Sequence, residues 1–370
     1  MKDGEMGKRL VLLVAVAMTA MVGCSDSDKS TSKEELAEQQ PAVAQFKVVE
    51  SFNVGDGVYV RSLAEDKSTN SLWIGTSIGV LQVDLSSRDL IKTYSRDDGL
   101  ANEFVFSIYA DSKGYKWFGT DGGGMSRYRD GEWKTYFPMH GLADYWVYSF
   151  TEQKDGTIWV GTWAGLNRVD GETEVFTTYL EELVNEWVYG LDVDKQDRVW
   201  IGTEGGVNMY DGETWSTWTH NDGLGASNDK GYSVSDNTGL GTRSRHDLSV
   251  SAYGVETYNP NYVFDIEVAN DGTVWAGTWG GGIAHYDGET WQNYTINDGS
   301  AGNIVYSVAE SPDGMMWFGT NRGLSGFDGK NWHNYDMNHG LLDNNVYDIA
   351  VTENNQIWVG TRNGVAVLAQ

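Results

Sequence analysis

The sequence predicts an all-β protein, and three observations support this fold class. Its 370 residues include 46 Gly but only 4 Pro, a composition that suits many tight turns and few long helices. A Trp-x-Gly-Thr motif occurs seven times, and Asp-Gly pairs, a strong hairpin signal, recur between short β-type runs. We therefore expect a seven-bladed β-propeller made of four-stranded antiparallel blades.

The charge of the chain excludes some partners. Lys and Arg number 26 against 53 Asp and Glu, which gives a formal net charge of −27. Because a nucleic-acid binder needs a surplus of cations to neutralise phosphates, we expect no nucleic-acid partner. The same deficit disfavours binding to an anionic membrane surface. With 40% hydrophobic residues and 16 Trp, the chain can build a core and is not broadly disordered.

The first residues have the features of an export signal. Lys2, Lys8 and Arg9 precede an apolar run over residues 10–20, which is too short to span a bilayer. We therefore predict a signal peptide over residues 1–23. Cys24 follows it and is the only cysteine, so no disulfide can form within the chain.

The segment Met21-Val22-Gly23-Cys24 resembles a bacterial lipobox. The resemblance implies cleavage before Cys24 and acylation of that residue with chains such as palmitate, so that the only membrane contact is a lipid anchor. Ser25 favours sorting to the outer membrane of the cell envelope. Both the periplasmic face and the cell-surface face of that membrane stay open as the location of the propeller. Residues 24–45 are then a polar tether. The alternative is an ordinary secretory signal with an incidental cysteine.

The repeats fill residues 46–370, interrupted by an insertion at about 225–257. Spacings between successive motif tryptophans are 44, 42, 41, 75, 42 and 41 residues. A Val lies twelve residues before six of them and is followed by an aromatic residue; in the first unit we assign Val58 and Tyr59 to these positions, fifteen residues before the Trp. A Gly six residues after every Trp predicts a turn with positive φ. The motif tryptophans are Trp73, Trp117, Trp159, Trp200, Trp275, Trp317 and Trp358.

Each unit is expected to form four short strands. In the second unit we predict strands at 105–110, 116–120, 125–128 and 133–137, with an Asp130-Gly131 hairpin turn between the last two. The last unit ends after its third strand, 365–368. A strand within 46–52 is available at the other end of the domain. We expect this N-terminal strand to complete the last blade and close the ring.

The repeat consensus resembles the two-component regulator propeller family. It is clearest in Trp317-Phe318-Gly319-Thr320, Gly323-Leu324 and Phe327-Asp328-Gly329. The resemblance implies a periplasmic sensing module, usually part of a hybrid histidine kinase and often tied to polysaccharide use. This chain offers no room for kinase domains. It is therefore expected to bind or sense a ligand without its own signalling effector.

Strand direction places a candidate ligand site. If the innermost strand of each blade runs from one face of the disc to the other, the turns after the second and fourth strands share a face. Four tryptophans outside the repeated Trp positions fall on these turns, where they could stack against a glycan or a peptide. The alternative is that these rings plug the channel or brace loops. The site comprises Trp146, Trp163, Trp187 and Trp279, with polar residues Tyr145, Asp121, Glu186, Glu204, Asn321 and Arg362.

Other functions have weaker support. The insertion leaves from the same face and could be a lid or a neutral addition. No zinc, nucleophile-elbow or phosphate-loop motif is present, and Asp192 and Asp194 alone are a weak calcium signal, so we predict no enzyme activity, no cofactor and no metal. A lyase remains an alternative because virginiamycin lyase is also a seven-bladed propeller. A second alternative is an acidic scaffold for a protein partner in the envelope.

Overall fold

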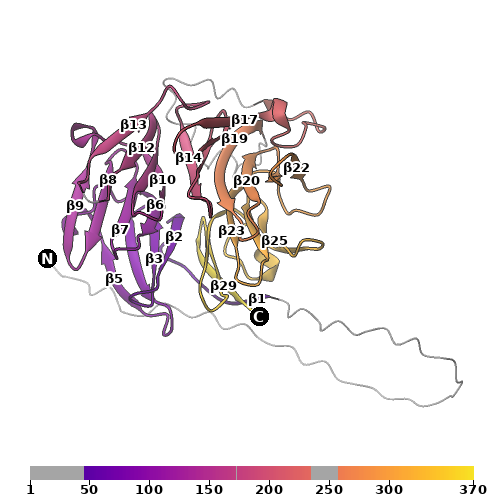
Figure 1. The fold of residues 1–370 in the computed structure, drawn as a ribbon. Helices are drawn as coiled ribbons and strands as arrows, with labels where there is room; N and C mark the ends of the chain where they lie inside the picture. Colours follow the sequence, from indigo (N-terminus) through magenta and orange to yellow (C-terminus); the bar gives the residue numbers. More distant parts are fainter. Residues whose placement is uncertain (1–45, 172, 235–256) are drawn as a thin grey trace, which may run out of the picture.

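Seven antiparallel sheets are arranged radially in the computed structural model (Figure 1), which describes residues 46–171, 173–234 and 257–370. The predicted all-β, seven-bladed fold is confirmed. The predicted signal peptide, Cys24, the tether and most of the insertion, residues 235–256, lie outside the described residues. Among the described residues, no helix has the length and apolar character needed to cross a membrane.

The first four blades follow one another along the chain, each from the inner strand outwards. Blade 1 contains β2 (Val60–Asp66), β3 (Ser71–Thr76), β4 (Gly79–Asp84) and β5 (Leu90–Tyr94). Blade 2 contains β6 (Val105–Ala110), β7 (Lys116–Thr120), β8 (Met125–Arg129) and β9 (Glu132–Tyr136). Blade 3 contains β10 (Val147–Glu152), β11 (Ile158–Thr162), β12 (Gly165–Val169) and β13 (Phe176–Tyr179). Blade 4 contains β14 (Val188–Val193), β15 (Val199–Thr203), β16 (Gly206–Tyr210) and β17 (Trp215–Trp218).

Blades 5 and 7 differ from the first four at one edge of the sheet, whereas blade 6 has the regular four strands. Blade 5 contains β19 (Thr257–Val268), β20 (Val274–Trp279), β21 (Ile283–Tyr286) and β22 (Trp291–Tyr294), and β18 (Ser233–Val234) pairs in parallel with β19. Blade 6 contains β23 (Val305–Glu310), β24 (Met316–Thr320), β25 (Gly323–Phe327) and β26 (Trp332–Tyr335). Blade 7 contains β27 (Val346–Val351), β28 (Ile357–Thr361), β29 (Gly364–Ala369) and β1 (Lys47–Phe52).

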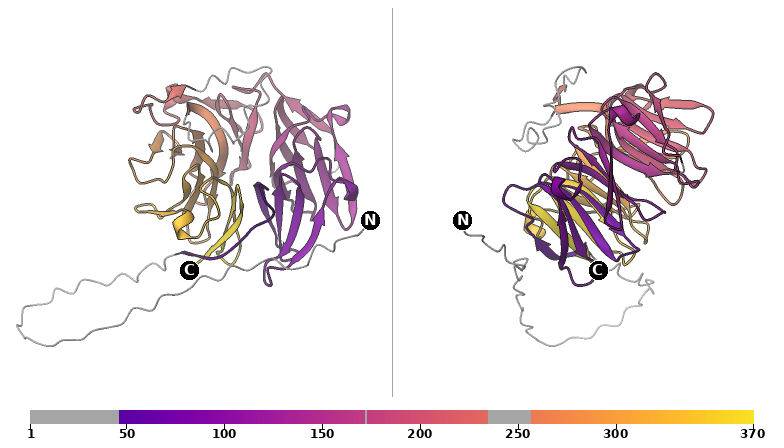
Figure 2. Two further views of the ribbon diagram at one scale, coloured as in Figure 1. Left: turned by 180° about the vertical axis from the view of Figure 1, so that it is seen from behind. Right: turned by 90° about the vertical axis from the view of Figure 1, so that its left-hand side faces the viewer.

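The ring is closed by pairing the two ends of the domain in one blade. Strand β1 runs antiparallel to β29, with Lys47 opposite Ala369 and Phe52 opposite Val365 (Figures 1 and 2). Phe46 and Phe52 are buried and pack edge-on against Trp317 and Trp358. The predicted closure is therefore confirmed, and β29 has a partner along its outer edge.

The Trp-x-Gly-Thr motif has a packing function in every blade. The seven tryptophans are at most 6% exposed and lie between sheets. The motif Gly faces the first Val of the next blade's inner strand: a Cβ on Gly319 would lie 2.8 Å from a methyl carbon of Val346. The motif Thr closes the turn that follows, as in the 2.7 Å bond from the Thr320 hydroxyl to the Gly323 carbonyl. Close approach of neighbouring blades thus requires a glycine in the motif.

Two details of the predicted register are wrong. In blade 1, Val60 rather than Val58 pairs with the motif residue Thr76, because the stretch from Ala64 on β2 to its partner Trp73 is one residue longer than the equivalent stretch in the other blades. Arg61 consequently takes the position that an aromatic residue holds in the six other blades. Gly123 and Gly281 do not adopt positive φ; their turns are one residue longer, and the neighbouring Gly124 and Gly282 do so instead.

Candidate functional site

The two kinds of turn that carry the predicted site lie on one face of the propeller. Backbone hydrogen bonds join them directly: the Trp163 N–H donates to the Trp146 carbonyl at 3.1 Å, and the Glu204 N–H donates to the Trp187 carbonyl at 3.1 Å. An equivalent bond runs from Asn321 to Ile304 at 3.0 Å. The strand-direction argument is therefore correct, and this face surrounds one mouth of the central channel.

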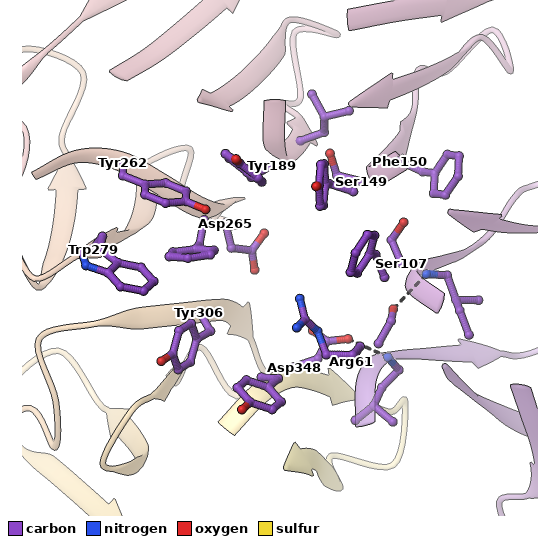
Figure 3. Close-up of a pocket in the computed structure, with 18 residues that line it drawn as sticks. Arg61, Ser107, Ser149, Phe150, Tyr189, Tyr262, Asp265, Trp279, Tyr306 and Asp348 are labelled. Atoms are coloured by element: carbon purple, nitrogen blue, oxygen red, sulfur yellow. Dashed lines mark hydrogen bonds between the residues drawn. The ribbon is translucent and has the colours of Figure 1, made fainter. Parts of the chain in front are cut away.

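A cavity of about 230 Å³ occupies this mouth. Figure 3 shows Tyr262, Trp279 and Tyr306 along one side of it, with Arg61 and Asp265 pointing into the open space. The wall is formed mainly by the residue after the first Val of each inner strand. These seven equivalent residues, one from each blade, are Arg61, Phe106, Tyr148, Tyr189, Phe264, Tyr306 and Tyr347.

Arg61 is the single cation in this ring of aromatic side chains. Its guanidinium carbon lies 5.3 Å from the ring centres of both Phe106 and Tyr347. Burial lowers the pKa of Arg61, but a guanidinium stays charged at every physiological pH. The cavity wall therefore carries a permanent positive charge.

Two carboxyl groups line the same cavity, one position further along their strands than the aromatic residue. Asp348 accepts a 2.6 Å hydrogen bond from the Leu63 backbone N–H, and Asp265 accepts one of 2.8 Å from Val308. Each bond joins one blade to the next. Burial raises the pKa of Asp265 to about 8 and the pKa of Asp348 to about 7. At neutral pH much of their negative charge is therefore lost, while Arg61 keeps its own.

The four predicted tryptophans lie close together around the channel mouth but differ in their access to the cavity. Trp279 lines it and stacks on Tyr262 at 5.6 Å between ring centres. Trp163 packs edge-on against Trp146 at 6.1 Å and Trp187 at 5.2 Å, outside the lining. Trp163, Trp187 and Trp279 are at most 7% exposed. All four rings thus pack against aromatic neighbours, and three of them are buried.

The predicted polar residues are spread around the same face. Glu204 is buried within hydrogen-bond distance of the Tyr189 hydroxyl, and Arg362 lies over the Tyr59 ring at 5.3 Å. Tyr145 is 44% exposed. Asp121, Glu186 and Asn321 are partly buried on turns, and none of the six predicted polar residues lines the cavity.

Sequence reasoning missed the charged residues that line the cavity: Arg61, Asp265 and Asp348. The residue after each aromatic position is Ser in four blades and Asp in two, a regularity that was available in the sequence. Arg61 was hidden by the misplaced register of the first unit. Alignment on Trp73 alone could not find it, because the β2–β3 hairpin contains one extra residue between Val60 and that Trp.

The described residues hold no group of three or more His, Cys, Asp or Glu side chains arranged to bind a metal ion. Asp192 lies on the inner strand β14 and accepts a 2.6 Å bond from the Val268 N–H, and burial raises its pKa to about 6. Asp194 instead accepts bonds from Arg198 and Trp200. The two carboxylates thus have separate structural partners.

Comparison with known proteins supports the repeat assignment. Residues 141–164, 299–322 and 340–363 match the model of the family described as two component regulator propeller. The chain is a seven-bladed β-propeller. Its match to that family in these three segments confirms the resemblance predicted from the sequence. No curated protein is similar enough in sequence to count as a match.

Solved structures share the fold. The extracellular domain of BT3049 from B. thetaiotaomicron, assigned as a hybrid two component system, matches with a TM-score of 0.68 and 22% identity over 85% of this chain and 39% of that one. The extracellular domain of BT4673 from the same organism, assigned as a one component system, matches with a TM-score of 0.64 and 18% identity. The match covers 88% of this chain and 40% of that one. This chain therefore spans about two fifths of those two structures.

A catalytically inactive virginiamycin B lyase from Staphylococcus aureus, solved with quinupristin, also matches. The TM-score is 0.64 and the identity 12%, over 88% of this chain and 100% of the lyase. At these identities the likeness shows the fold alone.

Proposed function

We propose that the protein is an extracytoplasmic binding or sensing propeller that holds a glycan or a similar small ligand at the channel mouth. The observation that carries this proposal is the aromatic cavity with Arg61, Asp265 and Asp348 in its wall. Sugar rings bind to aromatic faces through their C–H bonds and are oriented by a few polar groups. The likeness to extracellular domains of signalling proteins supports a sensing role.

Titration calorimetry of the wild type against a panel of oligosaccharides tests the proposal, with Trp279→Phe as the informative variant. The smaller ring keeps an apolar wall but removes part of the stacking surface, which is worth about 1 kcal/mol, or about fivefold in affinity. Trp215→Phe on the outer strand β17 is the matched control and should bind as the wild type does. Equal binding by all three proteins would contradict a site at the mouth.

Phenylalanine is the suitable replacement because the tryptophan side chains at the channel mouth are buried. Alanine would be a poor replacement at Trp163 or Trp279. Both side chains are at most 7% exposed, so truncation to Ala would cost about 3–5 kcal/mol of folding stability and confuse the binding result.

We further propose that the propeller is held in the cell envelope by acylation of Cys24. The lipobox-like segment and the extracellular setting of the similar domains support this proposal. Metabolic labelling with a palmitate analogue should mark the wild type but not Cys24→Ala. Labelling of both proteins, or of neither, would contradict it.

Turnover of any oligosaccharide in the panel would instead favour the lyase alternative.

A further inference from the structure

From the geometry of the channel mouth we infer that the ligand carries a carboxylate, as an acidic sugar does, and that Arg61 binds this carboxylate through its guanidinium. The inference rests on the proposed function and narrows the class of ligand. The surface charge of the protein alone would favour neutral or cationic ligands, but the cavity wall holds a permanent cation, Arg61.

The first argument is that Arg61 has unused hydrogen-bonding capacity. Among the described residues, no hydrogen-bond acceptor bonds to its guanidinium and no carboxylate lies within ion-pair distance; its close neighbours are the faces of Phe106 and Tyr347. A guanidinium has five N–H donors, and withdrawing them from water is costly unless acceptors replace the water. Cation–π contacts offset only part of that cost.

The second argument concerns position. Six of the seven equivalent wall residues are aromatic, so packing of the ring is satisfied by a flat apolar side chain. Arg61 breaks this pattern and points into the same open space as Asp265, which comes from blade 5 across the ring (Figure 3). A planar carboxylate matches the fork of a guanidinium with two parallel hydrogen bonds.

The remaining lining fits the rest of an acidic sugar. Asp265 already accepts the backbone N–H groups of Ile266 and Val308, and Asp348 accepts that of Leu63; their remaining lone pairs can accept ligand hydroxyl groups. Trp279 and Tyr306 provide aromatic surface on the side shown in Figure 3. The cavity of about 230 Å³ is small, which suits one sugar ring inserted at a chain end.

The charge state of the wall supports anion binding at neutral and mildly acidic pH. The titratable groups of the wall around Arg61 are Asp348 and Tyr347 on β27, Tyr148 on β10, Tyr189 on β14, Tyr262 and Asp265 on β19, and Tyr306 on β23. Glu204 and Arg362 contact aromatic residues of the same face, and Asp192 and Glu267 interact electrostatically with Asp265. With a pKa of about 7 for Asp348 and about 8 for Asp265, rising pH adds negative charge beside Arg61. Carboxylate binding should therefore weaken from about pH 6 to pH 9.

The experiment compares D-glucuronate and D-galacturonate with D-glucose and D-galactose by saturation-transfer NMR and calorimetry at millimolar concentrations. At about pH 6 the uronates are ionised, and the wild type should prefer them by at least about tenfold. Arg61→Gln should remove the preference, whereas Arg61→Lys, which keeps the charge without the fork, should retain part of it. Melting temperatures of both variants show whether they fold.

Each outcome bears on a separate claim. Equal binding of acidic and neutral sugars, unchanged in Arg61→Gln, would overturn the inference and leave the proposed function standing. Binding of no sugar at all would overturn both. If the variants do not fold, the pH series on the wild type decides: uronate affinity that is flat or rises from about pH 6 to pH 9 contradicts the inference.

Discussion

At the scale of single residues, buried charge is used to join blades. Lys116 of β7 forms a 2.5 Å ion pair with Asp66 of β2, and both side chains are at most 7% exposed. Ser68 and Thr69 also donate hydrogen bonds to Asp66. Burial alone would raise the pKa of this carboxyl, but the bonds from Lys116, Ser68 and Thr69 outweigh burial and lower it.

Removing one member of this pair should be costly. We expect Lys116→Met to lower the free energy of unfolding by about 3 kcal/mol, because Asp66 is left as a buried charge without its cation. Urea unfolding measures the change, and the double variant Lys116→Met with Asp66→Leu should recover part of it. Because the pKa of Asp66 is lowered, the pair stabilises above about pH 4 and its contribution is lost below that value. A single variant as stable as the wild type at neutral pH would contradict the assignment.

At the scale of elements, the closing strand β1 is the segment on which the ring depends. It is held by pairing with β29 and by two aromatic anchors, one at each end. Along the strand, side chains alternate in environment: Phe52 is 3% exposed, whereas Val49 is 59% exposed. Only the inward side chains contribute packing between blade 7 and its neighbours.

We expect Phe52→Ala to lower the free energy of unfolding by about 3 kcal/mol, since it opens a cavity against Trp358. Val49→Ala on the same strand is the control and should change stability by less than about 0.5 kcal/mol. Chemical denaturation of both proteins compares them directly. If the two substitutions have equal effects, β1 does not act as an anchored closing strand.

At the scale of the whole molecule, the channel concentrates acidic groups whose charge is suppressed by burial. Burial raises the pKa of Asp192 to about 6, of Asp348 to about 7 and of Asp265 to about 8. The folded protein then holds protons that the unfolded chain releases above about pH 4. These groups therefore favour the folded state at low pH and lose that contribution as pH rises through the folded values.

Thermal unfolding should show this dependence. The wild type is expected to lose at least about 1 kcal/mol of stability from pH 5 to pH 9, and Asp265→Asn with Asp348→Asn should flatten the slope. Asn keeps an oxygen to accept the Val308 and Leu63 N–H groups, so the bonds between blades remain possible. Parallel slopes for wild type and variant would show that these carboxyls do not titrate on unfolding.

The sequence by itself determined the number of blades and the way the ring closes. The repeated motif predicts radial stacking of the sheets, because its Trp fills the space between neighbouring sheets and its Gly permits their close approach. The last repeat has three strands of its own, and β1 from the other end of the domain supplies the fourth. It also placed the four unusual tryptophans on one face, because strand direction follows from strand count.

Only the tertiary structure decided which side chains share the cavity. Arg61, Asp265 and Asp348 are up to 287 residues apart in sequence and come together because inner strands from three blades line one channel. A single extra residue in the β2–β3 hairpin, between Ala64 and its partner Trp73, moved Arg61 into the ring, and no local pattern marks that insertion. Whether Trp163 faces a ligand or a neighbouring ring is likewise set by packing across blades, which a repeat pattern within one chain segment does not contain.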